Sequence, residues 1–299
     1  IGARSKYYSK QIDVAKALVK VAEIELRREV SIDYGTAYVA HQRLIVYDRL
    51  DSIYRNFEKA AKLRYETEAT SKLEYISAQN QARQIRLMKQ QAIQDEQIAL
   101  RNLNRWLGDK ILYTTDGSIA GLSTDIIQPS TIHPTLQFAD EKIKLAGSKY
   151  KMEKSEFFPK FFVDYGRQKI GSVSGYYSYQ VGLSIPLFFG AQSGRTKSAK
   201  IQCDIAQQNY DLQQRELTSQ RNTTTGQYEK WKSSLSYYNE TALPLAKEQQ
   251  QAAMQYYLKG ATDYIGFIQN MKDAAQIQLD YWNCYSEYLI TKFNLEYYY

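Results

Sequence analysis

Proline, cysteine, histidine and long apolar runs are all scarce in this chain. Its 299 residues include 5 Pro, 2 Cys and 2 His, and no run of 18 or more apolar residues. The shortage of proline permits very long helices, because proline inside a helix removes a hydrogen bond and clashes with the preceding turn. The lack of a long apolar run excludes a transmembrane helix. It does not exclude a transmembrane strand, whose alternating pattern escapes hydropathy averages.

Residues suited to catalysis or metal binding are equally sparse. His41 and His133 lie far apart in the sequence, and Cys203 and Cys284 do not form a CxxC pair. The methionines are scattered too, at Met88, Met152, Met254 and Met271. These residues predict neither an enzyme, nor a cofactor site, nor a soft-metal site. We interpret His41 as a polar residue within a helix.

The charge balance is basic, with 39 Lys and Arg against 32 Asp and Glu, a formal net charge of +7. Basic and acidic residues are interspersed, as in residues 23–29, which indicates solvated helix surface and argues against a nucleic-acid partner. The mean hydropathy is −0.55. Nevertheless, 27 Tyr, 10 Phe and 3 Trp are too many aromatic residues for a disordered chain.

Helical periodicity dominates the sequence. Residues 5–63 contain no proline and one glycine, and their apolar residues recur at steps of three and four. A single helix of about 60 residues is predicted, roughly 90 Å long, which must belong to a coiled coil or an extended bundle. A second helix, residues 70–107, is predicted to end at Gly108. Because the connection between them is short, these two helices must form an antiparallel hairpin.

The second half of the chain repeats this plan. A short helix is predicted over residues 135–154, followed much later by a long helix over 193–259 with a kink at Pro244, and a shorter helix over 262–295. The segment 64–70 matches 256–262, an offset of 192 residues, whereas the helix starts at Gly2 and Gly190 are offset by 188. The sequence therefore contains two long helical hairpins, and the second long helix has about one extra turn.

A change to period two marks the segment between the repeats. Apolar and aromatic residues alternate with polar ones over 177–187 and over 157–169, and residues 171–175 have the composition of a turn. Two strands of about ten residues each match the length of a tilted transmembrane hairpin, and their aromatic ends suit a membrane interface. A soluble hairpin on a small sheet would show the same alternation.

The order of these elements resembles the outer-membrane factor (TolC-like) family of tripartite efflux systems. Within that family the chain looks closest to the CusC-like branch, which serves heavy-metal pumps of the resistance-nodulation-division (RND) type. The resemblance rests on the strand-to-helix segment 181–190, the tip turn 257–264, the segment 243–246 and the stretch from 133–136 to 158–159. It covers essentially the whole chain, and the order of the motifs is more specific than any one of them.

The resemblance implies a mainly α fold with a membrane β-hairpin. Three protomers would close a 12-stranded barrel continued by an α-helical tunnel. The implied protein is a passive efflux duct without a cofactor, acting as a homotrimer in outer-membrane lipid with a periplasmic adaptor protein and an inner-membrane RND pump. Fusion to the pump is an alternative, as in some relatives. We also expect the family's two short helices and first strand pair to precede residue 1.

Four segments with different roles are expected on this basis. Residues 3–107 would form the first tunnel hairpin, 108–156 an equatorial segment, 157–189 the transmembrane hairpin and 190–297 the second tunnel hairpin. The membrane-facing strand would present Tyr177, Tyr179, Val181, Leu183, Ile185 and Leu187. Polar runs such as 207–209 and 213–214 would face the lumen and the solvent, and a polar lumen passes solutes without binding them tightly.

The family's gate lies just past the second tip, where aspartates form a constriction. The matching positions here are Gly266 and Gln269, which are not acidic, so Asp263 or Glu74 is expected to substitute. The alternative for Asp263 is that it caps the following helix.

The resemblance also places the adaptor contacts at the two hairpin tips. The expected contact residues are Tyr65, Glu68, Thr70, Tyr257, Gly260 and Thr262. Because Glu68 stands where the family often has glycine, the first tip turn is expected to be built differently. A second hypothesis, of another class, remains: a soluble coiled-coil scaffold without a transport role.

Overall fold

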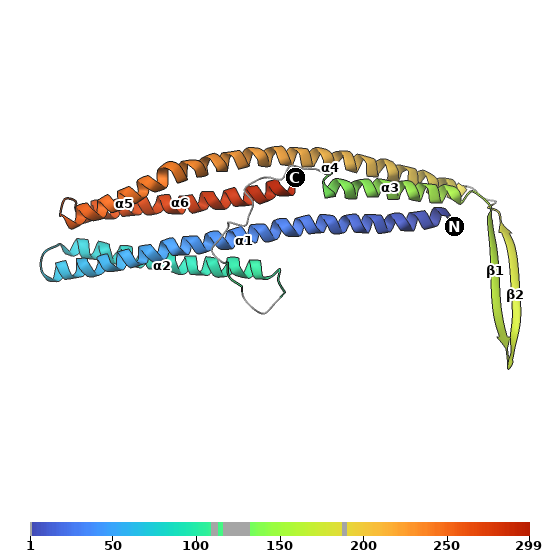
Figure 1. Cartoon of the computed structure of the whole chain (residues 1–299), viewed down its shortest axis with the longest axis horizontal. Helices are drawn as coiled ribbons and strands as arrows, with labels where there is room; N and C mark the ends of the chain where they lie inside the picture. Colours follow the sequence, from blue (N-terminus) through green and yellow to red (C-terminus); the bar gives the residue numbers. More distant parts are fainter. Residues whose placement is uncertain (1, 109–112, 116–131, 187–189) are drawn as a thin grey trace. The chain divides into compact units, whose positions relative to one another are not determined.

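The computed structural model describes residues 2–108, 113–115, 132–186 and 190–299 (Figure 1). The mainly helical class with one antiparallel strand pair is confirmed. In chain order the elements are α1 (Gly2–Glu66), α2 (Lys72–Asn104), α3 (Pro134–Ser155), β1 (Lys160–Ile170), β2 (Val173–Ser184), α4 (Gly190–Tyr237), the π-helix η1 (Tyr238–Ala242), α5 (Leu243–Leu258) and α6 (Tyr264–Tyr297).

The chain divides into two compact units, and the division cuts across α1 and α4. Unit 1 comprises residues 1–24 and 129–219, and unit 2 comprises residues 25–128 and 220–299. Unit 1 therefore holds the start of α1, α3, the β-hairpin and the first part of α4. Unit 2 holds both helical hairpin tips.

The core of unit 2 lies between the two helical hairpins, α1–α2 and α5–α6. Phe57 of α1 stacks on Phe267 of α6 with ring centroids 4.2 Å apart. The buried residues around this pair are Val46, Leu50, Tyr54, Ala61, Ala78, Ala82, Ile85, Ala253, Tyr264, Ile268, Met271 and Ala275. The alanines let the helices approach closely, and the aromatic rings fill the space between the hairpins.

A second cluster in unit 2 explains the glycine in the interior of the long first helix, Gly35. Val39 of α1 packs with Leu289 and Phe293 of α6. A Cβ at Gly35 would lie 3.2 Å from a Phe293 ring carbon and 3.3 Å from a Leu289 methyl carbon. Glycine at this position therefore permits α1 and α6 to pack directly against each other.

The kink predicted at Pro244 takes the form of a π-helix. The α-helical pattern of α4 gives way to η1 just before the proline, which sits in the first turn of α5. Proline lacks an N–H and its ring clashes with the preceding turn, so the disturbance lies on its N-terminal side. Together these elements span residues 190–258, four residues more than α1, which accounts for the extra turn in the repeat.

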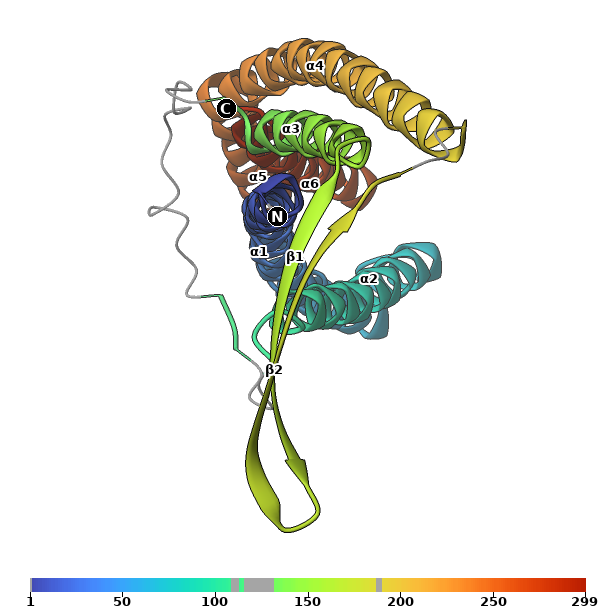
Figure 2. The same ribbon diagram turned by 90° about the vertical axis from the view of Figure 1, so that its right-hand side faces the viewer.

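In unit 1, α3 lies beside the start of α1 and the start of α4 (Figure 2). Arg4 of α1 forms an ion pair with Glu156 at the end of α3, with 3.6 Å between Nη2 and Oε1. Gln192 of α4 donates a hydrogen bond to the backbone carbonyl of Glu153, at 2.6 Å. These contacts bring three helix ends together at the base of the β-hairpin.

The turn of the β-hairpin is tighter than the sequence predicted. Its two-residue turn consists of Gly171 and Ser172, and Gly171 has φ +61°. The second strand begins at Val173 instead of Tyr177, because Gly175, with φ +115°, is absorbed as a β-bulge. A two-residue turn requires a positive φ that glycine supplies, and a bulge accommodates one extra residue without ending the strand.

Candidate functional site

One face of the β-hairpin is apolar and exposed. Directly paired residues point to the same side of a ladder, and the pairs Phe161–Leu183, Val163–Val181 and Tyr165–Tyr179 alternate along it. Val163 and Val181 are each 76% exposed. The predicted membrane-facing residues Tyr177, Tyr179, Val181, Leu183 and Ile185 are all exposed, and Leu187 lies outside the described residues. The two strands thus present a continuous apolar surface with nothing packed against it in the described part of the chain.

The opposite face of the hairpin is polar. It carries the pairs Asp164–Gln180 and Gly166–Ser178, and the ring of Phe162 lies over Gly182, where a Cβ would approach it to 2.2 Å. Within the described residues the sheet contains only β1 and β2, so each strand has one edge without a backbone partner. Unpaired strand edges favour addition of further strands.

The two hairpin tips have the same backbone hydrogen bonds. In the first, the N–H of Ala69 donates to Arg64 O (2.7 Å) and that of Glu68 to Tyr65 O (3.0 Å). In the second, 192 residues later, Ala261 donates to Tyr256 O (2.8 Å) and Gly260 to Tyr257 O (3.0 Å). Both are Schellman turns. The expectation that Glu68 changes the first turn is wrong: Glu68 adopts φ 58°, close to the 69° of Gly260.

Helix caps and aromatic pairs extend the match between the tips. Ser71 accepts a hydrogen bond from Glu74 N, and Asp263 accepts one from Gly266 N, again 192 residues apart. Tyr65 stacks on Tyr75 at 5.7 Å, and the equivalent Tyr257 packs on Phe267 at 4.9 Å. Each aromatic pair holds the end of a long helix against the start of the shorter one.

The gate candidates of the second tip have distinct surroundings. The Asp263 carboxylate caps α6, 2.8 Å from Gly266 N, as the capping alternative anticipated. A Cβ at Gly266 would lie 2.8 Å from Thr262 Oγ1 and 3.0 Å from Asp263 Oδ1, so glycine lets these side chains fold over the helix start. Gln269 is exposed and donates to Asp273, one turn further along α6.

Glu74, the gate candidate of the first tip, belongs to a network that joins the two tips. It contacts Thr70 Oγ1 and lies 3.5 Å from Arg64, measured between Oε1 and Nη1. The same Arg64 nitrogen donates to the Tyr257 hydroxyl at 3.0 Å. Arg64 was not predicted as a site residue, because its partner on the second tip is 193 residues away. Its only signal in the sequence was that it is the first residue of the repeated tip segment 64–70.

Two tyrosine hydroxyls are buried in the core beneath the tips. Tyr54 is 2% exposed and Tyr264 is 5% exposed. Burial raises the pKa of Tyr54 to about 12, and burial together with the neighbouring Tyr54, Tyr257 and Glu74 raises the pKa of Tyr264. Removing a phenolate from water is costly, so both side chains stay neutral throughout the physiological range.

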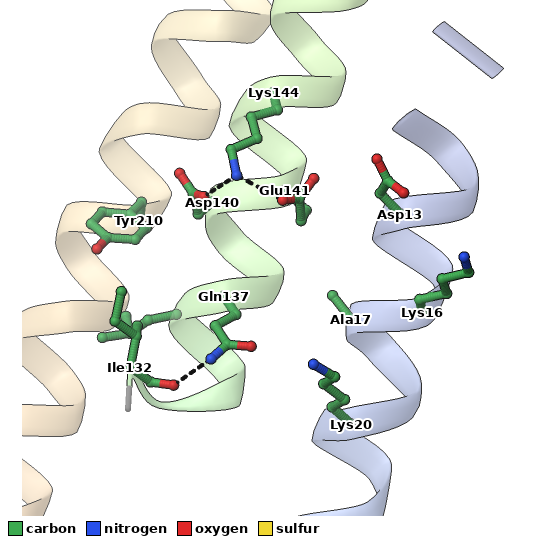
Figure 3. A pocket seen from close by; sticks show the side chains of 11 residues that line it. Asp13, Lys16, Ala17, Lys20, Ile132, Gln137, Asp140, Glu141, Lys144 and Tyr210 are labelled. Carbon is green, nitrogen blue, oxygen red and sulfur yellow. Dashed lines mark hydrogen bonds and ion pairs between the residues drawn. The ribbon is translucent and has the colours of Figure 1, made fainter. Parts of the chain in front are cut away.

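A charged pocket of about 900 Å³ lies in unit 1 between α1, α3 and α4 (Figure 3). Lys144 bridges Asp140 and Glu141 on its own helix, with N–O distances of 2.7 Å to each. Lys10 pairs with Asp13 at 2.7 Å, which raises the pKa of Lys10 and lowers that of Asp13. Because its acids are paired with lysines, the pocket offers no strong charge of one sign to a ligand.

His41 has a structural partner, whereas the two cysteines form no disulfide. The His41 ring lies 2.6 Å from a Glu96 oxygen and joins α1 to α2, and Cys203 and Cys284 are free thiols. No group of three or more His, Cys, Asp or Glu that would hold a metal ion occurs among the described residues. None of the helices described is long and apolar enough to cross a membrane.

Residues 132–295, more than half of the chain, match the model of the family described as outer membrane efflux protein. The chain belongs to this family. The matched segment includes α3, the β-hairpin and nearly all of the second helical hairpin. The family description names efflux at the outer membrane, the role that the resemblance implied. No curated protein matches the chain closely enough to count as a relative.

Solved structures of membrane proteins share the fold. A membrane protein from Pseudomonas aeruginosa is 16% identical with a TM-score of 0.85, and the match covers 99% of this chain and 72% of that one. CusC is 14% identical with a TM-score of 0.81 and coverage of 98% and 72%. The open state of the MtrE outer membrane channel from Neisseria gonorrhoeae is 11% identical, with a TM-score of 0.79 and coverage of 99% and 70%.

Proposed function

We propose that the protein is the exit duct of a tripartite efflux system of the RND type. In this proposal three copies form a passive outer-membrane channel, which a periplasmic adaptor protein connects to an inner-membrane pump. The family match supports the role in outer-membrane efflux. The trimer, the barrel, the adaptor and the pump are parts of the proposal, which the fold shared with CusC and MtrE supports.

The β-hairpin carries the proposal. Within the described chain it has an exposed apolar face, a polar opposite face and two edges without a backbone partner. In a bilayer every backbone group must find a partner within the protein, so an isolated hairpin cannot cross it. Pairing with further barrel strands would satisfy both edges, place Val163 and Val181 against lipid, and turn Asp164 and Gln180 toward a wet interior.

A polar stripe on α6 supports a water-filled tunnel. Its residues are spaced alternately four and three apart: Gln269, Asp273, Gln276, Asp280, Asn283 and Glu287. Gln269 donates to Asp273 at 2.9 Å and Gln276 to Asp280 at 2.8 Å. This spacing keeps one face of α6 polar over several turns while other faces pack in the core. We assign this face to the lumen.

The tips are the proposed site of gating and adaptor contact. Tyr65, Glu68 and Thr70 on the first tip, and Tyr257, Gly260 and Thr262 on the second, form two turns of matching geometry. A single adaptor motif is therefore able to contact both. For the gate we propose Glu74, held by Arg64, and the start of α6 with Asp263, Gly266 and Gln269.

Heavy-metal ions are the proposed cargo, on the resemblance to the CusC-like branch. We assign metal selectivity to the pump instead of the duct. Among the described residues, no three or more His, Cys, Asp or Glu side chains gather where they could hold a metal ion.

Reconstitution tests the proposal. The protein should require detergent for extraction, run as a trimer in native mass spectrometry, and give discrete conductance steps in planar bilayers. A freely soluble protein without conductance would instead support the coiled-coil scaffold. Loss of metal resistance on deletion, restored by the wild-type gene, would assign the cargo.

A further inference from the structure

The excess positive charge of the chain is concentrated at one place. Three stretches of 12 residues, 2–13, 149–160 and 190–201, contain ten basic and three acidic residues. Their net charge of +7 equals that of the whole chain, so basic and acidic residues balance over the remainder. All three stretches belong to unit 1. Basic and acidic residues are therefore balanced in the rest of the chain, but basic residues predominate in these three stretches.

Tertiary contacts bring these stretches together at the base of the β-hairpin. Arg4 pairs with Glu156, which joins the start of α1 to the end of α3. Gln192 donates to the backbone and the carboxylate of Glu153, which joins the start of α4 to α3. The chain passes from α3 into β1 within a few residues, so the charged helix ends surround the root of the hairpin.

The acidic residues in these stretches are already engaged. Asp13 pairs with Lys10, Glu153 accepts from Gln192, and Glu156 contacts both Arg4 and Lys160. Five basic residues remain exposed and have no ion pair within the described residues. These are Lys6, Lys151, Lys154, Arg195 and Lys197, which we call the basic collar. No acidic side chain in the first turn of α4 offsets the partial positive charge of that helix end.

Exposed aromatic residues adjoin the basic collar on the hairpin side. Phe158 is 65% exposed, Phe161 is 79% exposed and Phe162 is 45% exposed. Aromatic side chains followed by basic ones are typical of a membrane–water boundary, where rings lie at headgroup depth and cations lie just outside. The uncompensated charge is thus placed where the hairpin would leave the bilayer.

We propose that the basic collar binds the anionic headgroups of phospholipids at the bilayer surface from which the hairpin emerges. This inference rests on the proposed membrane insertion of the hairpin. Lysine and arginine at the surface attract anionic lipid over a range set by the Debye length, so the interaction weakens with salt. Bound lipid would fix the depth of the hairpin and brace the three helix ends against one another.

A charge-matched pair of variants tests the proposal in the full protein. The collar variant is Lys151→Gln, Lys154→Gln, Lys197→Gln. The control variant is Lys59→Gln, Lys247→Gln, Lys272→Gln, which removes the same charge from exposed helix positions of unit 2. Thermal unfolding is measured in neutral detergent with added phosphatidylglycerol, phosphatidylethanolamine, inorganic phosphate or polyglutamate.

Phosphatidylglycerol is expected to raise the unfolding midpoint of the wild type and the control variant by about 4 °C, and that of the collar variant by less than half as much. Phosphatidylethanolamine and phosphate should have little effect. An equal shift in all three proteins would overturn the lipid assignment, as would an equal effect of phosphate. Stabilisation by polyglutamate as strong as that by lipid would identify a protein-docking surface instead.

Conductance of the same samples separates this inference from the proposed function. A wild-type protein that forms no channels contradicts the duct, whatever the lipid measurement shows. Channel formation together with equal lipid shifts in the collar and control variants contradicts the lipid site alone.

Discussion

Glu68 and Gly260 occupy the same position of the two tip turns, with φ angles of 58° and 69°. Glycine adopts this left-handed conformation freely, whereas a residue with a Cβ is strained there. The first turn nevertheless forms the same two backbone hydrogen bonds as the second. The packed helices on either side impose the turn, and they hold Glu68 in the left-handed conformation despite its backbone strain.

Replacing Glu68 is therefore expected to stabilise the protein. Glu68→Gly should raise the free energy of unfolding by up to about 1 kcal/mol, because it relieves the left-handed strain. Gly260→Ala should lower it by a similar amount. Chemical unfolding in detergent measures both. A loss of stability in Glu68→Gly would show that this side chain makes a contact that outweighs the strain.

Variants of Asp263 should separate its capping role from its charge. Asp263→Ala removes the acceptor for Gly266 N and is expected to cost about 1 kcal/mol of stability. Asp263→Asn keeps an acceptor and should retain most of the stability. Single-channel recording of Asp263→Asn then reports the charge alone. Changed conductance or cation block would place Asp263 at the pore, and unchanged recordings would leave it as a helix cap.

Neighbouring strand residues provide a test of the hairpin's orientation. Val181 lies on the apolar face and Gln180 on the polar face of β2. Val181→Lys is expected to cost about 2–4 kcal/mol in the membrane-inserted state if Val181 lies near the bilayer midplane, and to reduce insertion. Gln180→Lys adds the same charge on the other face and should insert normally. Protease protection of reconstituted protein measures insertion; equal insertion of the two variants would contradict the assigned orientation.

The buried Tyr54 predicts a loss of stability in alkaline solution. Its pKa rises from 10.0 to about 12 on folding, so the neutral form is favoured in the folded state. Above pH 10 the unfolded chain loses this proton while the folded chain keeps it. The contribution of Tyr54 to the free energy of unfolding is therefore fully present below pH 10. It is lost between about pH 10 and pH 12, by an amount on the order of 2 kcal/mol.

Tyr54→Phe should flatten this alkaline decline, measured as unfolding free energy from pH 8 to pH 11. The matched control is Tyr256→Phe, because Tyr256 is exposed. If the unfolding free energy of Tyr54→Phe fell with pH as steeply as that of the wild type, burial of the Tyr54 hydroxyl would not be the cause of the alkaline decline.

The sequence alone was sufficient to predict the helices, the strand pair and the repeat. Steps of three and four over α1, and strict alternation over β2, indicate which side of each element is apolar. The family resemblance followed from the order of these elements. Gly108 and Gly260 also marked helix ends in the sequence, since a helix end often requires a residue with a positive φ.

Only the tertiary structure decided the features that depend on distant residues. Arg64 donates a hydrogen bond to Tyr257, which is 193 residues away in the sequence. The need for glycine at position 35 comes from the close approach of Phe293 and Leu289. The turn at Glu68 was predicted wrongly because a local preference of about 1 kcal/mol is small beside the packing of four helices. The basic collar appeared only when three separated stretches were brought together. Local preferences act between neighbours in sequence, whereas packing and charge act between neighbours in space.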